Sequence, residues 1–387
     1  MSTYHRPVAK RPAKPKAEKA PKLEATKPPP RLTPAPVPLG SLIGHDRAAK
    51  VLQDAMRSGR IHHAWIFHGQ AGVGKCTAAL AFAAILLDPT SQATFSGEIS
   101  PDPESTTQRL LQSGTHPDMH LVVKELAKYH DDSQVRSRKL QSIPIDVLRD
   151  FVLAPSAVNA AIRTSAMAAK VFIIDEAELL NIAGQNALLK FLEEPPDRTV
   201  IILVTSAEEY LLPTIRSRCQ RVFFGPLRDA DMRRWLTQTK LEVPEEQLGW
   251  LLEFASGAPG MLQGAVTENL AGWWERLAPM LARADQGEYV AELGPAMHEL
   301  IDAWAKDFAE RDANNSKELA NRIASERMLR LVASHLRRGL TKSDPARAAT
   351  RLDALRGAER ALDANVNLLF VFEKLAAEIS LPAGMTP

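Results

Sequence analysis

The sequence predicts an α/β domain built on a parallel sheet with a phosphate-binding loop, followed by a region made only of helices. Three observations support this prediction. Residues 69–76 read Gly-Gln-Ala-Gly-Val-Gly-Lys-Cys, a glycine-rich loop that reaches the lysine typical of P-loops. Short apolar runs alternate with helical segments up to about residue 225, a pattern typical of parallel strands covered on both faces. Beyond Asp229 only the helical spacing of apolar residues remains.

The chain has 387 residues, more than one hydrophobic core usually serves, so we expect two or three domains. Residues 1–38 hold nine lysines and arginines against two glutamates, together with ten of the 27 prolines. We predict that this basic tail is disordered, because it has few large apolar side chains to bury. Its charge suits loose attraction to nucleic acid or to an acidic partner, and a solvated extension is the simpler interpretation. Subtracting its +7 from the total charge of +2 leaves −5 on the rest of the chain.

The cysteine content and the apolar runs exclude several classes of protein. Cys76 and Cys219 are the two cysteines of the sequence, too few for a disulfide framework or a four-thiolate zinc site. No signal peptide and no apolar stretch of about 20 residues is recognisable, so we expect no membrane span. The cytoplasm is the expected location.

Local patterns predict the elements in order. A helix should begin after Ile43-Gly44-His45, since the apolar positions that follow lie on one helical face. Residues 88–118 have weak periodicity and several prolines, and are predicted to form an insertion. Two helical regions should follow the sheet domain, over 226–272 and 273–387. Apolar runs predict strands at 64–68, 119–123, 170–174 and 199–205, with helices at 77–84, 143–153 and 182–193.

The loop itself predicts nucleotide binding with an impaired metal site. Backbone N–H groups of the turn built on Gly69, Gly72 and Gly74 would point at phosphate, and Lys75 would reach the β and γ oxygens. A hydroxyl normally follows this lysine and binds Mg²⁺, whereas this chain has Cys76. A thiol is a poor ligand for that hard cation, so hydrolysis should be weak or absent. Thr77 is rotated by roughly 100° from the required direction, and we expect it to face a phosphate or a neighbouring chain.

A second half of the site is predicted at the end of the strand 170–174. Asp175 and Glu176 follow this apolar run directly. P-loop ATPases place there the acid that holds Mg²⁺ through water and the acid that polarises the attacking water. Such a pair is a weak signal alone, and the loop about a hundred residues earlier strengthens it.

Two further segments are more specific. Residues 186–196 read Asn-Ala-Leu-Leu-Lys-Phe-Leu-Glu-Glu-Pro-Pro, and residues 212–219 read Leu-Pro-Thr-Ile-Arg-Ser-Arg-Cys. Together they resemble the clamp-loader branch of the AAA+ ATPases. With residues 61–65 and 114–118, the resemblance is strongest to the delta prime subunits of bacterial DNA polymerase III and covers about residues 40–225.

The resemblance implies an architecture and a role. It implies an AAA+ domain over 39–225, a helical lid over 226–272 and a helical collar for oligomerisation over 273–387. Arg218 matches the arginine finger of this family, which acts in trans on the nucleotide of an adjacent subunit. The implied partners are the gamma/tau and delta subunits, and through the complex the sliding clamp and primer–template DNA. The chain would then be a component of the DNA polymerase III holoenzyme with little or no ATPase of its own.

Departures from the family pattern sharpen this interpretation. Relatives often hold zinc before the His-Pro-Asp segment, whereas residues 97–114 contain no cysteine, so we expect no zinc. His62, His63 and His116 are predicted to be packed or capping residues rather than metal ligands. Gly260 stands near the place of the sensor-2 arginine. Thr205 and Ser206 lie where a sensor-1 polar residue would be.

Two other functions stay open at this stage. The chain would be an ATP-hydrolysing motor of the gamma/tau type if Lys75, Asp175 and Glu176 were catalytic and Thr77 replaced the missing Mg²⁺ ligand. It would be a stand-alone P-loop kinase or helicase-like ATPase if the segments 186–196 and 212–219 were incidental. The nucleotide site is therefore predicted to hold ATP or ADP with Mg²⁺ weakly at most.

Overall fold

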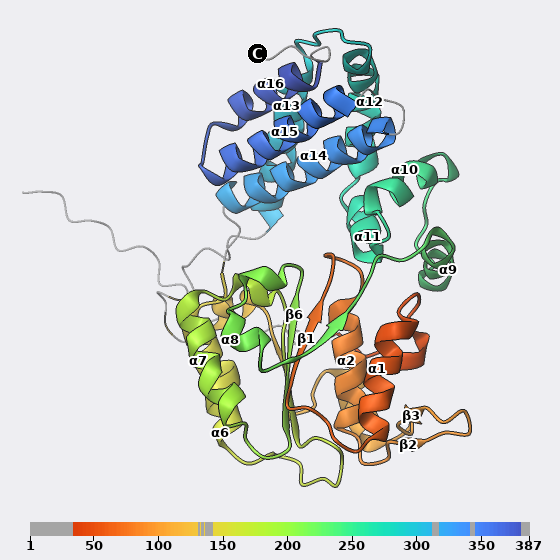
Figure 1. Cartoon of the computed structure of the whole chain (residues 1–387), viewed down its shortest axis with the longest axis vertical. Helices are drawn as coiled ribbons and strands as arrows, with labels where there is room; N and C mark the ends of the chain where they lie inside the picture. Colours follow the sequence, from red (N-terminus) through yellow and green to blue (C-terminus); the bar gives the residue numbers. More distant parts are fainter. Residues whose placement is uncertain are drawn as a thin grey trace, which may run out of the picture.

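A computed structural model describes residues 34–130, 132, 135, 142–311, 317–340 and 345–380. The α/β part of the chain and a helical part lie one above the other along the long axis of the molecule (Figure 1). The lid helices connect the two parts on one side. The predicted fold class is confirmed: a five-stranded parallel sheet with helices is followed by helices alone.

The central sheet has the strand order β4-β5-β6-β1-β7, and every neighbouring pair is parallel. Its strands are β4 (Met119–Val122), β5 (Lys170–Ile174), β6 (Thr199–Thr205), β1 (Ala64–His68) and β7 (Gln220–Phe223). The strands predicted at 64–68, 170–174 and 199–205 have these bounds. The edge strand β7 was not predicted, because its polar Gln-Arg-Val-Phe sequence has one buried residue and lacks an apolar run.

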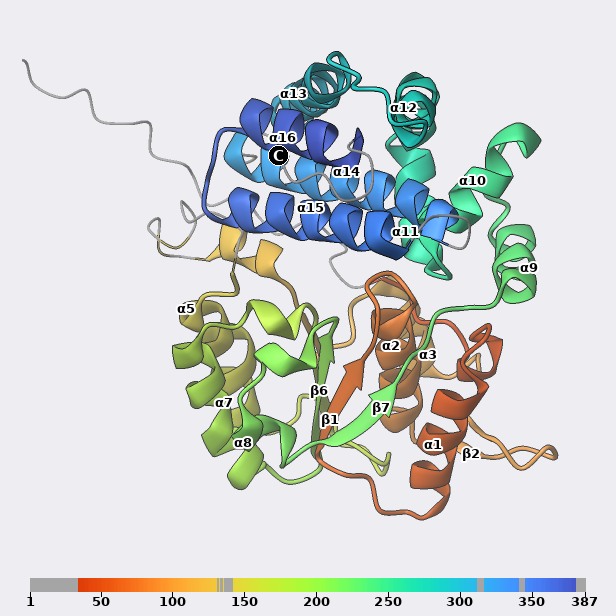
Figure 2. The same ribbon diagram turned by 45° about the horizontal axis from the view of Figure 1, so that its top comes forward.

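Alternating side chains of β1 enter two different hydrophobic cores. Trp65 and Phe67 pack in one core with the apolar residues of α2 (Lys75–Leu86), whereas Ala64 and Ile66 pack in the other with α7 (Ile182–Glu193). The period of two residues is what a strand covered on both faces requires. The helices α1, α2 and α3 cover the first face, and α5 to α8 cover the second (Figures 1 and 2). Their bounds are α1 (Asp46–Arg57), α2 (Lys75–Leu86), α3 (Thr106–Ser113), α5 (Ile145–Leu148), α6 (Ala154–Ala157), α7 (Ile182–Glu193) and α8 (Pro213–Arg216).

Two predicted segments differ from the structure. The insertion at 88–118 contains a small antiparallel pair, β2 (Gln92–Ala93) and β3 (Ile99–Ser100), followed by α3. The buried Asp88 carboxylate organises it by accepting hydrogen bonds from Thr90, Ser105 and Gln108. Such long-range polar contacts leave no periodic signal in the sequence. The single helix predicted at 143–153 is divided by a π-helical turn at Arg149–Leu153.

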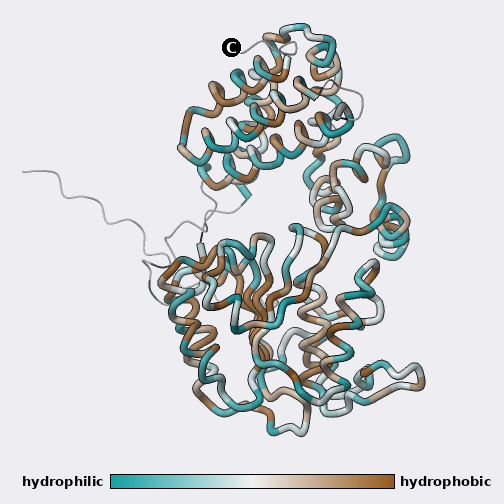
Figure 3. The backbone as a smooth tube through the Cα atoms, viewed as in Figure 1, coloured by the Kyte–Doolittle hydropathy of each residue, from teal (hydrophilic) through white to brown (hydrophobic). Residues whose placement is uncertain are grey.

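The helices beyond the sheet share one hydrophobic core. The lid region holds α9 (Asp229–Thr239), α10 (Glu245–Ala255) and α11 (Pro259–Thr267). The collar region holds α12 (Leu270–Asp285), α13 (Leu293–Arg311), α14 (Lys317–Leu340), α15 (Pro345–Asp363) and α16 (Leu368–Ser380). Buried residues of both regions belong to this core, and the boundary proposed at 272 falls inside α12. Figure 3 shows hydrophobic residues gathered along the sheet and on the inner sides of the collar helices.

Residues 1–33 of the tail that was predicted to be disordered lie outside the described residues. Its last part, 34–38, is placed against the α/β domain: Pro36 is buried, and its carbonyl accepts a hydrogen bond of 2.9 Å from Gln112 Nε2. Among the described residues, no helix is long and apolar enough to cross a membrane.

Candidate functional site

The phosphate-binding loop lies between β1 and α2, and its glycines are required by its shape. Gly69, Gly72 and Gly74 have φ angles of 141°, 78° and 106°, which side chains disfavour. A Cβ at Gly69 would lie 2.0 Å from the carbonyl oxygen of Phe224. The loop therefore has the compact conformation in which backbone N–H groups face a phosphate.

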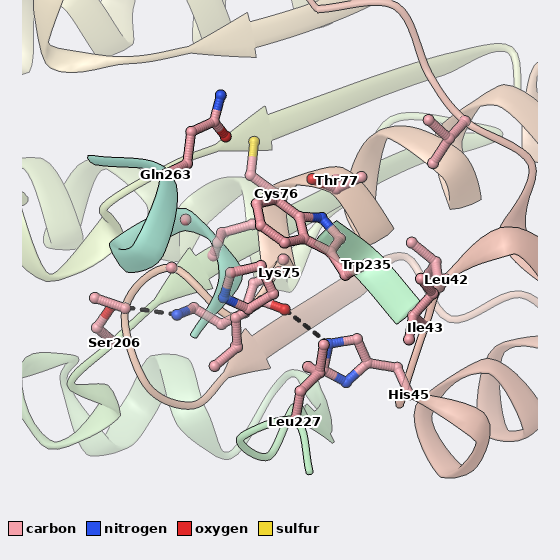
Figure 4. Close-up of a pocket in the computed structure, with 18 of the residues that line it drawn as sticks. Leu42, Ile43, His45, Lys75, Cys76, Thr77, Ser206, Leu227, Trp235 and Gln263 are labelled. Carbon is pink, nitrogen blue, oxygen red and sulfur yellow. Dashed lines mark hydrogen bonds between the residues drawn. The ribbon is translucent and has the colours of Figure 1, made fainter. Parts of the chain in front are cut away.

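Lys75 is buried at the start of α2, and its ammonium is oriented by the loop. Nζ donates hydrogen bonds of 2.7 Å to the carbonyls of Gly69 and Gln70, and a third of 3.2 Å to Ser206 Oγ (Figure 4). Burial lowers the pKa of Lys75, and attraction to Glu178 and Asp175 opposes that shift. The lysine is held at the phosphate end of a pocket.

Cys76 and Asp175 face each other where a Mg²⁺ site would be. Burial, with the charge of Asp175 beside it, raises the pKa of the Cys76 thiol far above its usual range. The thiol stays protonated and is hydrogen-bonded to the Asp175 carboxylate, whose own pKa is raised, chiefly by burial. A neutral thiol and a buried carboxylate are a poor donor set for Mg²⁺, which selects oxygen ligands. Thr77 lines the same pocket one residue further along α2.

The second predicted acid is turned toward a lysine. Glu176 lines the pocket, but its carboxylate forms an ion pair of 2.8 Å with Lys124. Its backbone has a φ of 50°, uncommon for a residue with a side chain. Glu178, to which the sequence analysis assigned no role, has one oxygen bound to the backbone N–H of Ser206 at 3.1 Å. Its other oxygen is buried without a hydrogen-bond partner.

Apolar side chains form part of the wall of this pocket. The volume of the whole pocket is about 770 Å³, within the range of small-molecule sites. Leu42, Ile43, Leu227 and Trp235 are among the residues that line it (Figure 4). His45 connects the wall to the loop, because its Nε2 lies 2.7 Å from the Val73 carbonyl oxygen. His45 and Trp235 were not predicted as site residues, since a lone histidine and a lid tryptophan carry no motif.

The lid contacts the loop directly through two glycines. The backbone N–H of Gly260 donates a hydrogen bond of 2.8 Å to the carbonyl of Gly72. A Cβ at Gly260 would lie 3.1 Å from the Gly72 Cα and carbonyl oxygen. A side chain at this position would therefore require the lid or the loop to shift by a few tenths of an ångström. Gly260 therefore places the lid at the phosphate end of the pocket and contributes no charged side chain there.

Arg218 does not line this pocket. It lies between α8 and β7, where its side chain is 37% exposed. Nη2 forms an ion pair of 2.9 Å with Glu193 Oε1, and Nη1 donates to the Thr214 carbonyl at 2.9 Å. The structure therefore brings together the predicted residues of the nucleotide site, Gly69, Gly72, Gly74, Lys75, Cys76, Thr77, Asp175 and Glu176, and leaves Arg218 apart from them.

The predicted histidines have structural contacts. His62 and His63 stack on each other, and His63 Nε2 lies 3.0 Å from the Leu192 carbonyl oxygen. His116 is buried, and its Nδ1 accepts a hydrogen bond from the backbone N–H of Asp118. Asp118 in turn accepts two backbone hydrogen bonds of 2.8 Å, from Ala161 and Ile162. Within the described ranges, no group of three or more His, Cys, Asp and Glu side chains could hold a metal ion.

The parallel sheet in this strand order, with the loop after β1 and an acid after β5, defines a P-loop protein of the AAA+ class. Residues 44–228 match the family described as DNA polymerase III, delta subunit. The chain is 33% identical to the delta' subunit of Pseudomonas aeruginosa over 198 residues, which are 51% of this chain and 53% of that protein. It is 30% identical to the delta' subunit of Escherichia coli over 204 residues, 53% of this chain and 54% of the relative.

These similarities support a delta prime-like clamp-loader protein, in agreement with the resemblance found in the sequence. It spans about half the length of the delta' relatives that it matches. The tau subunit of Bacillus subtilis is also 30% identical, over 231 residues that make up 58% of this chain and 36% of tau. A solved structure of a gamma subunit-related protein from Thermotoga maritima is 18% identical, with a TM-score of 0.40 over 85% of this chain and 98% of that one.

Proposed function

We propose that this chain is the delta prime subunit of a DNA polymerase III clamp loader, which hydrolyses little or no ATP and serves as a scaffold. It supplies Arg218 in trans to the nucleotide of a neighbouring gamma/tau subunit while the ring loads the sliding clamp on primer–template DNA. The observation that carries the proposal is the position of Arg218. The side chain is half-exposed, is held in a defined orientation and lies outside the chain's own nucleotide pocket.

The contacts of Arg218 suit a finger that acts on another molecule. A guanidinium has five N–H groups, of which Glu193 and the Thr214 carbonyl engage two. The remaining donors are free to meet the oxygens of a phosphate on an adjacent subunit. Holding the group in place before reaction is what electrostatic stabilisation of a transition state requires.

The nucleotide pocket supports the non-hydrolysing part of the proposal. Cys76 places a neutral thiol where Mg²⁺ needs an oxygen, and Glu176 is engaged by Lys124. A site with neither a full set of oxygen ligands for Mg²⁺ nor a free catalytic base has little means to cleave a phosphoanhydride. The similarity to tau favours the alternative of an ATP-hydrolysing motor, and these two features of the pocket argue against it.

The helices beyond the sheet are proposed to join the collar of the ring, with gamma/tau and delta as neighbours. Leu352, Val366 and Phe370 are exposed apolar side chains of α15, α16 and the turn between them. An apolar surface of this kind fits a subunit contact. The basic segment 1–33 lies outside the described residues, and its attraction to nucleic acid remains a prediction from charge.

The test is the ATPase rate of the complex reconstituted with gamma/tau, delta, clamp and primed DNA. Arg218→Ala should leave assembly intact and reduce turnover at the adjacent site by about 10³-fold, the lower end of the range for arginine fingers. The total ATPase rate of the complex then falls by the fraction that this one site contributes. Arg149→Ala, which removes another exposed arginine, should change nothing. An unchanged rate with Arg218→Ala in an intact complex would exclude the arginine finger.

A further inference from the structure

The nucleotide pocket has an excess of negative charge at its phosphate end. Among the described residues that line it, Lys75 is the one lysine or arginine, whereas Asp175, Glu176 and Glu178 are acidic. The pair with Lys124 offsets the charge of Glu176. Asp175 and Glu178 both attract the Lys75 ammonium before any nucleotide enters, whereas its three hydrogen bonds go to uncharged oxygens.

Glu178 is the acid with the least compensation. It lies just beyond β5, and its Oε1 accepts a hydrogen bond from the N–H of Ser206. Ser206 in turn accepts from Lys75 Nζ through its hydroxyl at 3.2 Å. The Oε2 atom is buried and has no hydrogen-bond partner. A single residue, Ser206, therefore links the Glu178 carboxylate to the Lys75 ammonium that would meet the β and γ phosphate oxygens.

Among the described residues that line the pocket, no second lysine or arginine offsets this charge. Active P-loop sites also use Mg²⁺ to neutralise phosphate charge, whereas here Cys76 offers a protonated thiol in place of the usual oxygen ligand. Gly260, the lid residue that touches the loop, has no side chain and so adds no cation. A γ-phosphate would add about one to two negative charges at the end of the pocket where Glu178 lies, in a partly desolvated setting that strengthens repulsion.

We propose that the pocket selects a nucleoside diphosphate over the triphosphate, and that Glu178 determines this selectivity by repelling the γ-phosphate. The backbone N–H groups of the loop and Lys75 suffice for a β-phosphate. The apolar wall of Leu42, Ile43 and Trp235 is available to the base and sugar. The inference rests on the proposed function, because a chain that turned over ATP would convert one ligand into the other.

The test measures binding of ADP and of ATP to the full-length chain by titration calorimetry, once with Mg²⁺ and once with a metal chelator. We expect ADP to bind at least about tenfold more tightly than ATP, with little effect of the chelator. Glu178→Gln should remove most of this difference by improving the binding of ATP. Glu209→Gln removes the same charge from an exposed position nearby and should leave the ratio unchanged.

Several results would overturn the inference. They are the absence of ADP binding, binding of ATP at least as tight as that of ADP, and an unchanged ratio in Glu178→Gln. Glu178→Ala serves as a second variant if the glutamine variant does not fold, which circular dichroism would show. A failure of this inference can be told apart from a failure of the proposed function, because the Arg218→Ala experiment measures the ATPase rate of the neighbouring subunit. Product analysis of the ATP titrations for released phosphate would detect a hydrolysing chain directly.

Discussion

Arg218 is held by Glu193 through an ion pair of 2.9 Å between Nη2 and Oε1. Glu193 is the last residue of α7, and Arg218 comes just after α8. In the sequence, 24 residues separate Glu193 from Arg218. The pair connects the two segments that first indicated the protein family, since Glu193 belongs to the run 186–196 and Arg218 to the run 212–219. A family motif thus has a physical role here: one segment orients the arginine of the other.

We predict that Glu193→Gln weakens the proposed trans action without abolishing it. The amide oxygen still accepts a hydrogen bond, but the attraction that orients the guanidinium falls, so we expect a reduction of about threefold to tenfold at the adjacent site. Turnover of the reconstituted complex at saturating ATP measures this. Glu194→Gln, which changes the next, exposed carboxylate, is the control. Equal rates for Glu193→Gln and the parent would show that the ion pair has no part in positioning.

Cys76→Ser should restore an oxygen ligand beside Asp175. We predict that the variant binds nucleotide at least about tenfold more tightly with Mg²⁺ than in metal chelator, whereas the parent shows little metal dependence. Equilibrium binding by the isolated chain checks this. Cys76→Ala, which removes the thiol without adding an oxygen, should behave like the parent. If the parent already turned over ATP with Mg²⁺, the motor interpretation would return and Thr77→Ala would be the next variant.

Gly260 and Gly264 lie on the same lid helix and should respond to alanine with opposite signs. A Cβ at Gly260 would lie 3.1 Å from the backbone of Gly72, so the lid or the loop must shift, at a cost of about 1 kcal/mol or more. A Cβ at Gly264 meets nothing within 4 Å, and alanine there should raise stability by about 0.5–1 kcal/mol through helix propensity. Chemical denaturation of both variants measures the difference, and equal effects would contradict the close contact.

The buried Asp88 should make stability depend on acid pH. Burial alone would raise its pKa, but hydrogen bonds from Ser105, Thr90 and Gln108 outweigh it and lower the pKa below the ordinary value of an aspartate. A lowered carboxyl pKa contributes stability above the unfolded value, and this stability is lost as pH falls through the folded value. We therefore expect Asp88→Asn to be less stable than the parent at neutral pH and to converge with it below about pH 3. Denaturation at pH 7 and pH 3 tests this.

The side chain of Arg351 connects three collar helices, α12, α15 and α16, from inside the core. It is 6% exposed, Nε donates to the Ile379 carbonyl at 3.0 Å, and Nη1 pairs with Asp285 at 2.7 Å. We predict that Arg351→Ala costs about 1–3 kcal/mol of unfolding free energy, because the buried Ile379 carbonyl loses its donor and the partly exposed Asp285 loses an ion pair. The exposed Arg356→Ala should change stability by less than about 0.5 kcal/mol. A small loss with Arg351→Ala would mean that His335, 3.0 Å from Asp285, compensates.

The sequence by itself determined the central elements and indicated the family. Glycine spacing specified the loop, since residues with side chains rarely adopt the backbone conformation of Gly69 or Gly74. Continuous apolar runs specified the central strands, because strands covered on both faces need them. The polar edge strand β7 left no such signal, and neither did the hydrogen bonds that organise the insertion around Asp88.

Only the tertiary structure decided which charges meet. It paired Glu176 with Lys124, across 52 residues of sequence, and left a buried oxygen of Glu178 near Lys75 instead. It placed the lid glycine Gly260 on the loop and Glu193 on Arg218. Local patterns follow from helix and strand geometry, which the order of residues contains. Electrostatic partners depend on distances of a few ångströms between segments far apart in the chain, and these distances exist only once the chain has packed.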